Sequence, residues 1–249
     1  IGLKNTKILA PKNGILNKLV YFTPEKDALK IKNALFEAGA GNIGNYSEAS
    51  FDLQGKGTFK GNEFSNPVLG EKGRREEAKE IRSEILFPSY LKQKLISVLK
   101  EIHPYEEVAY DVYKLENQNQ DVGSGMIGEL ENAVPVEVFL NHLKNTFNCG
   151  CIRHTKLVHQ EIKTVAICGG SGRFLLNNAI AKNADAFVSS DFKYHEFFDA
   201  ENKIMICDIG HYESEVATKE IFYEVLSENM SNIALVFSET NTNPTRYYK

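Results

Sequence analysis

The fold of this chain is constrained most by a short apolar run that ends at a glycine and is followed by a helical pattern. The run predicts one buried strand, and the pattern predicts the helix that follows it. Residues 204–209 are rich in isoleucine and uncharged up to Asp208, which predicts a buried strand. Gly210 marks a tight turn. Apolar residues then recur at three- and four-residue steps, as in a helix with one buried face: Val216, Ile221, Phe222, Val225 and Leu226. Ligands of α/β sheets bind at such junctions.

Two side chains of this junction can bind a metal ion. His211 and Glu215 are four residues apart, so both project from one face of the first helical turn. An imidazole and a carboxylate on one face form half of a site for a divalent transition metal, and a catalytic metal usually needs at least three protein ligands. The alternative is structural: His211 caps the helix and Glu215 interacts favourably with its dipole.

Three ordered segments resemble a known family. They are residues 167–172 (Ile-Cys-Gly-Gly-Ser-Gly), 190–195 (Ser-Asp-Phe-Lys-Tyr-His) and 208–215 (Asp-Ile-Gly-His-Tyr-Glu-Ser-Glu). Together they are similar to motifs of the NIF3-like family, whose members are also called GTP cyclohydrolase 1 type 2 homologues. The resemblance implies that His211 and Glu215 are ligands of a site for two divalent metal ions, with zinc expected and iron or manganese as alternatives.

The two upstream segments add further candidates. Asp191 and His195 follow the predicted buried strand 184–189, and we take both as candidates for proton transfer in the cleft. Each also has a structural interpretation, Asp191 as a helix cap and His195 as a hydrogen-bonded structural histidine. The turn at 169–172 could hold phosphate on helix N-terminal amides, or it could be a plain turn that passes close to the metal cleft.

The composition narrows the class of protein. The 249 residues are 42% hydrophobic and 25% charged, as in an ordinary globular protein, and no apolar run is long enough to span a membrane. A net charge of −4 without a basic arm gives no support for nucleic-acid binding. The four cysteines form no metal or redox motif, so we expect a reduced, cytoplasmic protein. Residues 116–249 hold 11 basic and 18 acidic side chains, which favours a cation.

The pattern along the chain divides it into three parts. Residues 1–13 are expected to be a link, 14–116 a ferredoxin-like βαββαβ domain, and 117–249 an α/β layer structure. In the middle part, 74–87 is ambiguous and interpreted as a strand. In the last part, we expect a helix after Pro135 with Val138, Phe139 and Leu143 facing inward, and strands at 152–158 and 232–238. The fold class is therefore α/β (α+β).

The middle part also resembles the PII/CutA-like domain inserted in the longer NIF3-like proteins, through residues 39–46 and 103–107. His103, Glu106 and Glu107 could bind a cation or act in acid–base chemistry, or they could form a structural turn fixed by Pro104. The glycine-rich loop 39–44 could receive a small anion, or it could only permit a sharp bend.

The family resemblance implies more than the residues themselves show. The chain begins at Ile1, and residues 1–6 are similar to the segment that follows the family's N-terminal half. We therefore expect a truncated chain whose missing half carries the remaining metal ligands, a pair of histidines and an aspartate. The resemblance also implies a homo-oligomer, commonly a hexameric ring, in which the tail 241–248 would pack against a neighbour.

Two functional hypotheses follow. The first is a metal-dependent hydrolase that acts on a nucleotide or another phosphoester, with a metal-bound water as nucleophile. The second is a non-catalytic metal-binding ring scaffold or a regulatory, sensing protein, which a PII-like insert would suit. No base-recognition pattern is visible, so only the resemblance suggests a GTP-like substrate.

Overall fold

The computed structural model describes residues 1–158 and 160–246 and forms two compact units. Unit 1 comprises Ile1–Pro11 and the chain from Val122 onward, and unit 2 comprises Lys12–Asp121. Each unit has its own sheet, helices and core, so the predicted mixed α/β class is confirmed. Residues 1–13 are not a link. They contain strand β1 (Lys4–Lys12), which is held in the sheet of unit 1 because Leu9 is fully buried in that core.

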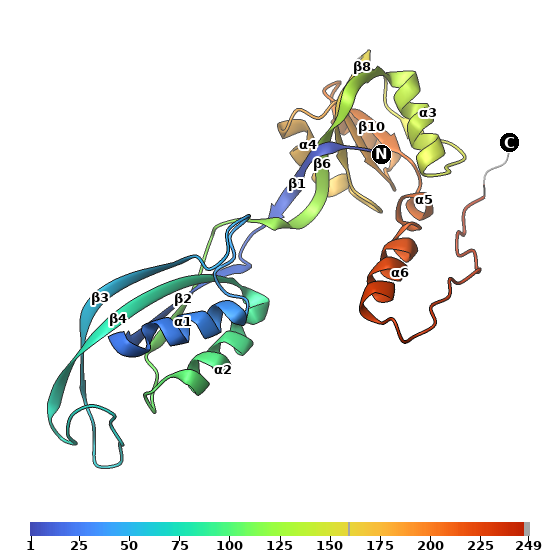
Figure 1. Cartoon of the computed structure of the whole chain (residues 1–249). Helices are drawn as coiled ribbons and strands as arrows, with labels where there is room; N and C mark the ends of the chain where they lie inside the picture. Colours follow the sequence, from blue (N-terminus) through green and yellow to red (C-terminus); the bar gives the residue numbers. More distant parts are fainter. Residues whose placement is uncertain (159, 247–249) are drawn as a thin grey trace. The chain divides into compact units, whose positions relative to one another are not determined.

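Unit 2 has the predicted βαββαβ order. Its elements are β2 (Leu16–Pro24), α1 (Ala28–Glu37), β3 (Ser50–Lys60), β4 (Arg75–Pro88), α2 (Lys92–Ile102) and β5 (Tyr110–Lys114). The antiparallel sheet has the order β3-β4-β2-β5, and α1 and α2 lie side by side over one face (Figure 1). Alternate side chains of β2 and β4 point toward the helices and pack on Ile31, Leu35, Leu95 and Leu99.

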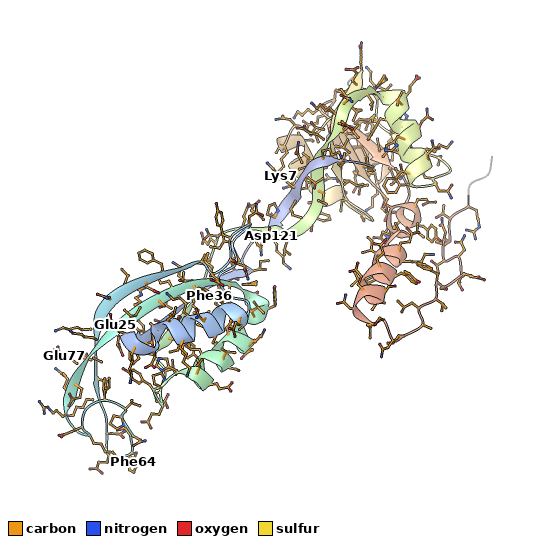
Figure 2. The ribbon with its side chains drawn as sticks, viewed as in Figure 1. Lys7, Glu25, Phe36, Phe64, Glu77 and Asp121 are labelled. Carbon is orange, nitrogen blue, oxygen red and sulfur yellow. The ribbon has the colours of Figure 1, made fainter. Side chains whose placement is uncertain are left out.

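The ambiguous segment 74–87 is strand from Arg75 onward, because β4 pairs with β2 on one side and with β3 on the other. Register with β3 runs from Ser50↔Ile85 to Lys60↔Arg75. Phe64 lies on the connection between these two strands (Figure 2) and is 94% exposed. A helix over Glu76–Glu80 is thereby ruled out by tertiary pairing, although its composition allows one.

For the loop 39–44 and for His103 in unit 2, the contacts favour a structural role over ligand binding. A Cβ at Gly41 would lie 2.8 Å from the ring of Phe36, so the loop 39–44 bends tightly against packed neighbours. The N–H of Gly41 donates to Leu86 O at 2.8 Å, which removes a donor that an anion would need. His103 is 7% exposed and accepts at Nδ1 from the N–H of Tyr105, so its Nε2–H donates to Phe22 O at 2.9 Å. Both ring nitrogens are occupied, as in a structural histidine.

Unit 1 is a six-stranded sheet covered on both faces. Its further elements are β6 (Asn119–Pro135), α3 (Val136–Thr146), β7 (Arg153–His154), β8 (Glu161–Ile167), α4 (Leu176–Ala181), β9 (Ala186–Ser189), β10 (Met205–Asp208), α5 (His211–Glu215) and α6 (Thr218–Asn229). Short 3-10 turns precede α4 (η3, Arg173–Leu175) and follow β9 (η4, Tyr194–Ala200). The strand order is β1-β6-β8-β9-β10-β7, with β8, β9 and β10 parallel. One face packs on α4 and η4, and the other packs on α3.

Several local predictions in unit 1 are wrong. The face of α6 expected to be buried is exposed, with Ile221 and Phe222 at 59% and 63%. Residues 232–238 form no strand, and only Arg153–His154 of 152–158 pairs as one. Phe139 and Leu143 face inward as predicted, but Val138 is 53% exposed because Val136 is the third residue that α3 turns toward the core. Within the described residues, no helix has the length and apolar character needed to cross a membrane.

Candidate metal-binding site

Three neighbouring parallel strands end at the same edge of the sheet in unit 1, and each is followed by one of the segments singled out in the sequence. Gly169 follows β8, Ser190 follows β9 and Gly210 follows β10. Carboxyl ends of adjacent parallel strands are where α/β proteins bind ligands. The topology therefore brings together segments that are about forty residues apart in the sequence.

Asp208 holds two of these turns together. It is 4% exposed and accepts the N–H of Phe192 at 3.1 Å and the N–H of Gly210 at 3.2 Å. A third donor, the Arg153 guanidinium, pairs with the same carboxylate. A buried carboxylate is stable only when it is paired and hydrogen-bonded in this way. Because Phe192 follows Asp191 and Gly210 precedes His211, Asp208 fixes the backbone beside both site residues.

Asp191, His211 and Glu215 form one contact chain at this edge. His211 Nδ1 lies 2.6 Å from Asp191 Oδ2, and His211 Nε2 lies 3.1 Å from Glu215 Oε2. All three side chains are about half exposed, at 48%, 50% and 52%, so solvent and ligands reach them. The hydrogen bond to Asp191 raises the pKa of the His211 imidazole. The predicted shared face of His211 and Glu215 is thus present in the structure.

Asp191 has a different local role from the helix cap considered above. Its φ of 61° lies in the left-handed region, and the 3-10 turn that follows begins at Tyr194 with Lys193 as its N-cap. Non-glycine residues in this conformation often lie at functional sites, where surrounding contacts hold the strain. Here the strained backbone turns the Asp191 carboxylate toward His211.

The ring orientation of His211 determines what its other nitrogen can do. A carboxylate only accepts, so Nδ1 carries a proton and donates it to Asp191. In the neutral ring, the Nε2 lone pair then faces a Glu215 oxygen 3.1 Å away. Two acceptors at that separation repel each other unless a cation lies between them, either a proton on Nε2 or a metal ion. A carboxylate–histidine–metal arrangement has this geometry.

The turn at 169–172 lies directly against this pair. A Cβ at Gly170, whose φ is 64°, would lie 2.3 Å from Glu215 Oε1. Its N–H donates to Ser214 Oγ at 2.8 Å, and the N–H of Gly172 donates to Ser189 Oγ at 2.9 Å. Two amides of the turn are therefore unavailable to a phosphate, and the tight contact of Gly170 with Glu215 agrees with a turn that passes close to the metal cleft.

A cavity of about 870 Å³ lies over the site. Asp191, His211 and Glu215 line it together with Arg153, Lys219 and residues of the C-terminal tail between Ser238 and Thr245. The tail is anchored by stacking of Phe237 on Tyr223 of α6 and by the bond from Asn243 Nδ2 to Glu213 at 3.2 Å. Sequence reasoning missed Arg153, which belongs to no recognisable motif. It expected the tail to pack against a neighbour and did not place it at this cavity.

His195 lies away from this cavity. It is exposed on η4, and its ring packs edge-on against Tyr194 at 5.2 Å. It is not among the residues that line the cavity, so its role in proton transfer stays a prediction. Cys168 lies closer to the site than His195 does. Burial raises the pKa of its thiol, and the negative charge of Glu215 raises this pKa further.

The described residues supply part of a metal site. His211 and Glu215 present a nitrogen and an oxygen close enough to bind one ion, and Asp191 orients the imidazole. Within residues 1–158 and 160–246, no group of three or more histidine, cysteine, aspartate or glutamate side chains is arranged to hold a metal ion. The pair fits a metal as half of a ligand set.

Comparisons with known proteins match this chain to one family. The family model described as Duf34/NIF3 (NGG1p interacting factor 3) matches residues 1–244. "GTP cyclohydrolase 1 type 2 homolog" proteins of Halalkalibacterium halodurans and Bacillus subtilis are 35% and 32% identical over 249 residues, which is 98% of this chain and 67% of each relative. A Bacillus cereus crystal structure, of a protein related to NIF3, has a TM-score of 0.80 at 34% identity and covers 99% of this chain and 67% of its own.

Proposed function

The chain belongs to the Duf34/NIF3 family, and from this premise we propose that His211 and Glu215 are two ligands of a divalent-metal site. The observation that carries the proposal is that His211 Nε2 lies 3.1 Å from a Glu215 oxygen, with the ring held from behind by Asp191 at 2.6 Å from Nδ1. A metal ion between these two acceptors removes their repulsion. Zinc suits a nitrogen and oxygen donor set, and iron or manganese are alternatives.

The other ligands of the proposed site come from outside the described residues. A metal with catalytic access needs at least three protein ligands, and the part of the chain that the structure describes presents two that converge. The relatives are longer than this chain, which spans 67% of their length. We propose that residues outside the described ranges or a second copy of the chain supply the missing donors. A complete set would hold two metal ions, as the family resemblance implies.

The proposed activity is hydrolysis of a nucleotide or another phosphoester, in line with the name of the relatives. A bound divalent ion supplies a water molecule whose pKa falls from about 16 toward 7. This chain holds the imidazole in one tautomer through Asp191, holds both turns through Asp208, and leaves a cavity of about 870 Å³ for the substrate. Such a cavity has the size of small-molecule sites.

A second candidate function is a metal-binding scaffold that assembles with copies of itself. The observation in its favour is the exposed apolar surface of α6, where Ile221, Phe222 and Val225 are 50–63% exposed. Apolar patches of this kind mark interfaces between proteins. A homo-oligomer, hexameric as the family resemblance implies, is compatible with either function.

Metal binding is tested first. The protein is dialysed against Zn²⁺, Mn²⁺ or Fe²⁺, and its metal content is measured for the wild type, for His211→Ala and Glu215→Ala, and for His142→Ala as a matched control. His142 is exposed and bonds to Ile1 O at 3.0 Å, away from the cavity. We expect both site variants to lose metal and the control to keep it. Equal loading in all four proteins would refute the site.

Catalysis is tested separately on the metal-loaded protein, with GTP, other nucleotides and simple phosphoesters as substrates. Hydrolysis that saturates with substrate and is abolished by Glu215→Ala supports the enzyme. Normal metal loading with no turnover of any substrate in the panel supports the scaffold.

A further inference from the structure

We infer that the cavity over His211 and Glu215 binds an anionic, phosphoryl-type group, and that Arg153 and Lys219 are the residues that hold it. The inference rests on the proposed function and adds to it the residues that select the ligand. Both side chains line the cavity, and neither belongs to the motifs found in the sequence.

Arg153 is held in a fixed orientation at the cavity. It lies on β7, and one terminal nitrogen, Nη2, donates to Phe192 O at 2.8 Å and pairs with Asp208. Its guanidinium also lies over the ring of Phe197, 5.4 Å from the ring centroid. These contacts order the side chain before any ligand arrives, which lowers the entropic cost of binding.

The rest of the Arg153 guanidinium is available to a ligand. Nε and Nη1 have no hydrogen-bond partner in the part of the chain that the structure describes, and the side chain is 57% exposed. Its partner Asp208 is only 4% exposed. A planar fork of N–H donors matches the oxygens of a phosphate, which it can bind at two points.

Lys219 adds a second cation to the same cavity. It follows Glu215 by four residues, is exposed at the start of α6, and has no carboxylate partner among the described residues. Lys203 of the same unit, by contrast, pairs with Glu201 at 2.5 Å. An exposed, unpaired ammonium on the rim of a cavity suits a polyanionic ligand.

The charges of the cavity couple anion binding to metal binding. Four carboxylates line it (Asp191, Asp208, Glu213 and Glu215) against the two cations Arg153 and Lys219, which leaves a formal charge of 2 − 4 = −2. An anion is therefore bound more weakly without a metal than beside one. Two divalent ions would make the cavity positive. Arg153 and Lys219 would then bind an anion that enters after the metal.

The test measures binding of inorganic phosphate by calorimetry, to protein loaded stoichiometrically with zinc and freed of excess metal, and to metal-free protein. The variants are Arg153→Gln, Arg153→Lys and Lys219→Gln, with Lys203→Gln as the charge-matched control outside the cavity. We expect Arg153→Gln and Lys219→Gln each to weaken phosphate binding about tenfold or more, as for loss of a charge-assisted hydrogen bond. Arg153→Lys should restore part of the affinity, and Lys203→Gln should change nothing.

The readouts separate this inference from the proposed function. Unchanged phosphate affinity in both Gln variants, or no phosphate binding by the wild type in either state at about 10 mM, overturns the inference while leaving the metal site intact. If zinc does not load, the proposed function fails, and the inference then stands only if the Gln variants still weaken binding to metal-free protein. Lys219 is exposed, so its variant tests the inference even if Arg153→Gln unfolds.

Discussion

Asp191→Asn isolates the contribution of the residue behind the imidazole. The carboxylate accepts the Nδ1–H of His211 at 2.6 Å and leaves Nε2 free to bind a metal. Asparagine has nearly the same shape and, like aspartate, tolerates the left-handed φ of 61° found here. The substitution therefore removes the negative charge and the strong hydrogen bond without adding backbone strain.

The expected loss of metal affinity is about 10- to 100-fold, the range measured when carboxylates behind metal-bound histidines are replaced. This corresponds to roughly 1.4–2.7 kcal/mol. A value near the lower end fits this site, because Asp191 is 48% exposed and solvent weakens its interaction with His211. The fold should keep its stability, since the turn is still held by Asp208.

The assay is a competition titration of zinc against a chromogenic chelator, with Asp199→Asn as the matched control. Asp199 lies in the same unit, pairs with Arg173, and does not line the cavity. The reasoning is refuted if Asp191→Asn and Asp199→Asn bind zinc with the affinity of the wild type.

The remaining predictions concern the turn, the cores and acid stability. Gly170→Ala should lower metal affinity and cost about 1–2 kcal/mol of stability, because a left-handed backbone and a contact 2.3 Å from Glu215 oppose the methyl group; unchanged zinc titration and unfolding curves would contradict this. Phe139→Ala should destabilise unit 1 by about 3–5 kcal/mol in urea unfolding, because the ring is fully buried, whereas Val138→Ala should cost under about 1 kcal/mol. The hydrogen bond from Lys18 lowers the pKa of Glu84, so the bond stabilises unit 2 above the ordinary carboxylate pKa of about 4.3 and is lost as pH falls below it. Unfolding monitored between pH 6 and pH 3 should therefore show a smaller loss in Glu84→Gln than in the wild type.

The sequence by itself was sufficient for features that depend on local periodicity and turn chemistry. The strand ending at Asp208, the turn at Gly210 with φ of 95°, and the common face of His211 and Glu215 are all set by neighbours within a few residues. The βαββαβ order of unit 2 follows largely from the succession of short patterns. Its exception is β4, whose first residues have a composition that also allows a helix and are strand only through pairing with β3.

The tertiary structure decided whatever depends on residues far apart in the sequence. Residues 1–13 become a strand because Leu9 finds a place in the core of unit 1, and the apolar face of α6 stays exposed because no described element packs on it. The sequence suggests Asp191 as a helix cap or as a group for proton transfer. Only the parallel pairing of β9 with β10 shows that its carboxylate lies 2.6 Å from His211. Arg153 joins the site only through β7 pairing with β10. Periodicity reports which face of an element is apolar, and only the packed chain shows what that face meets.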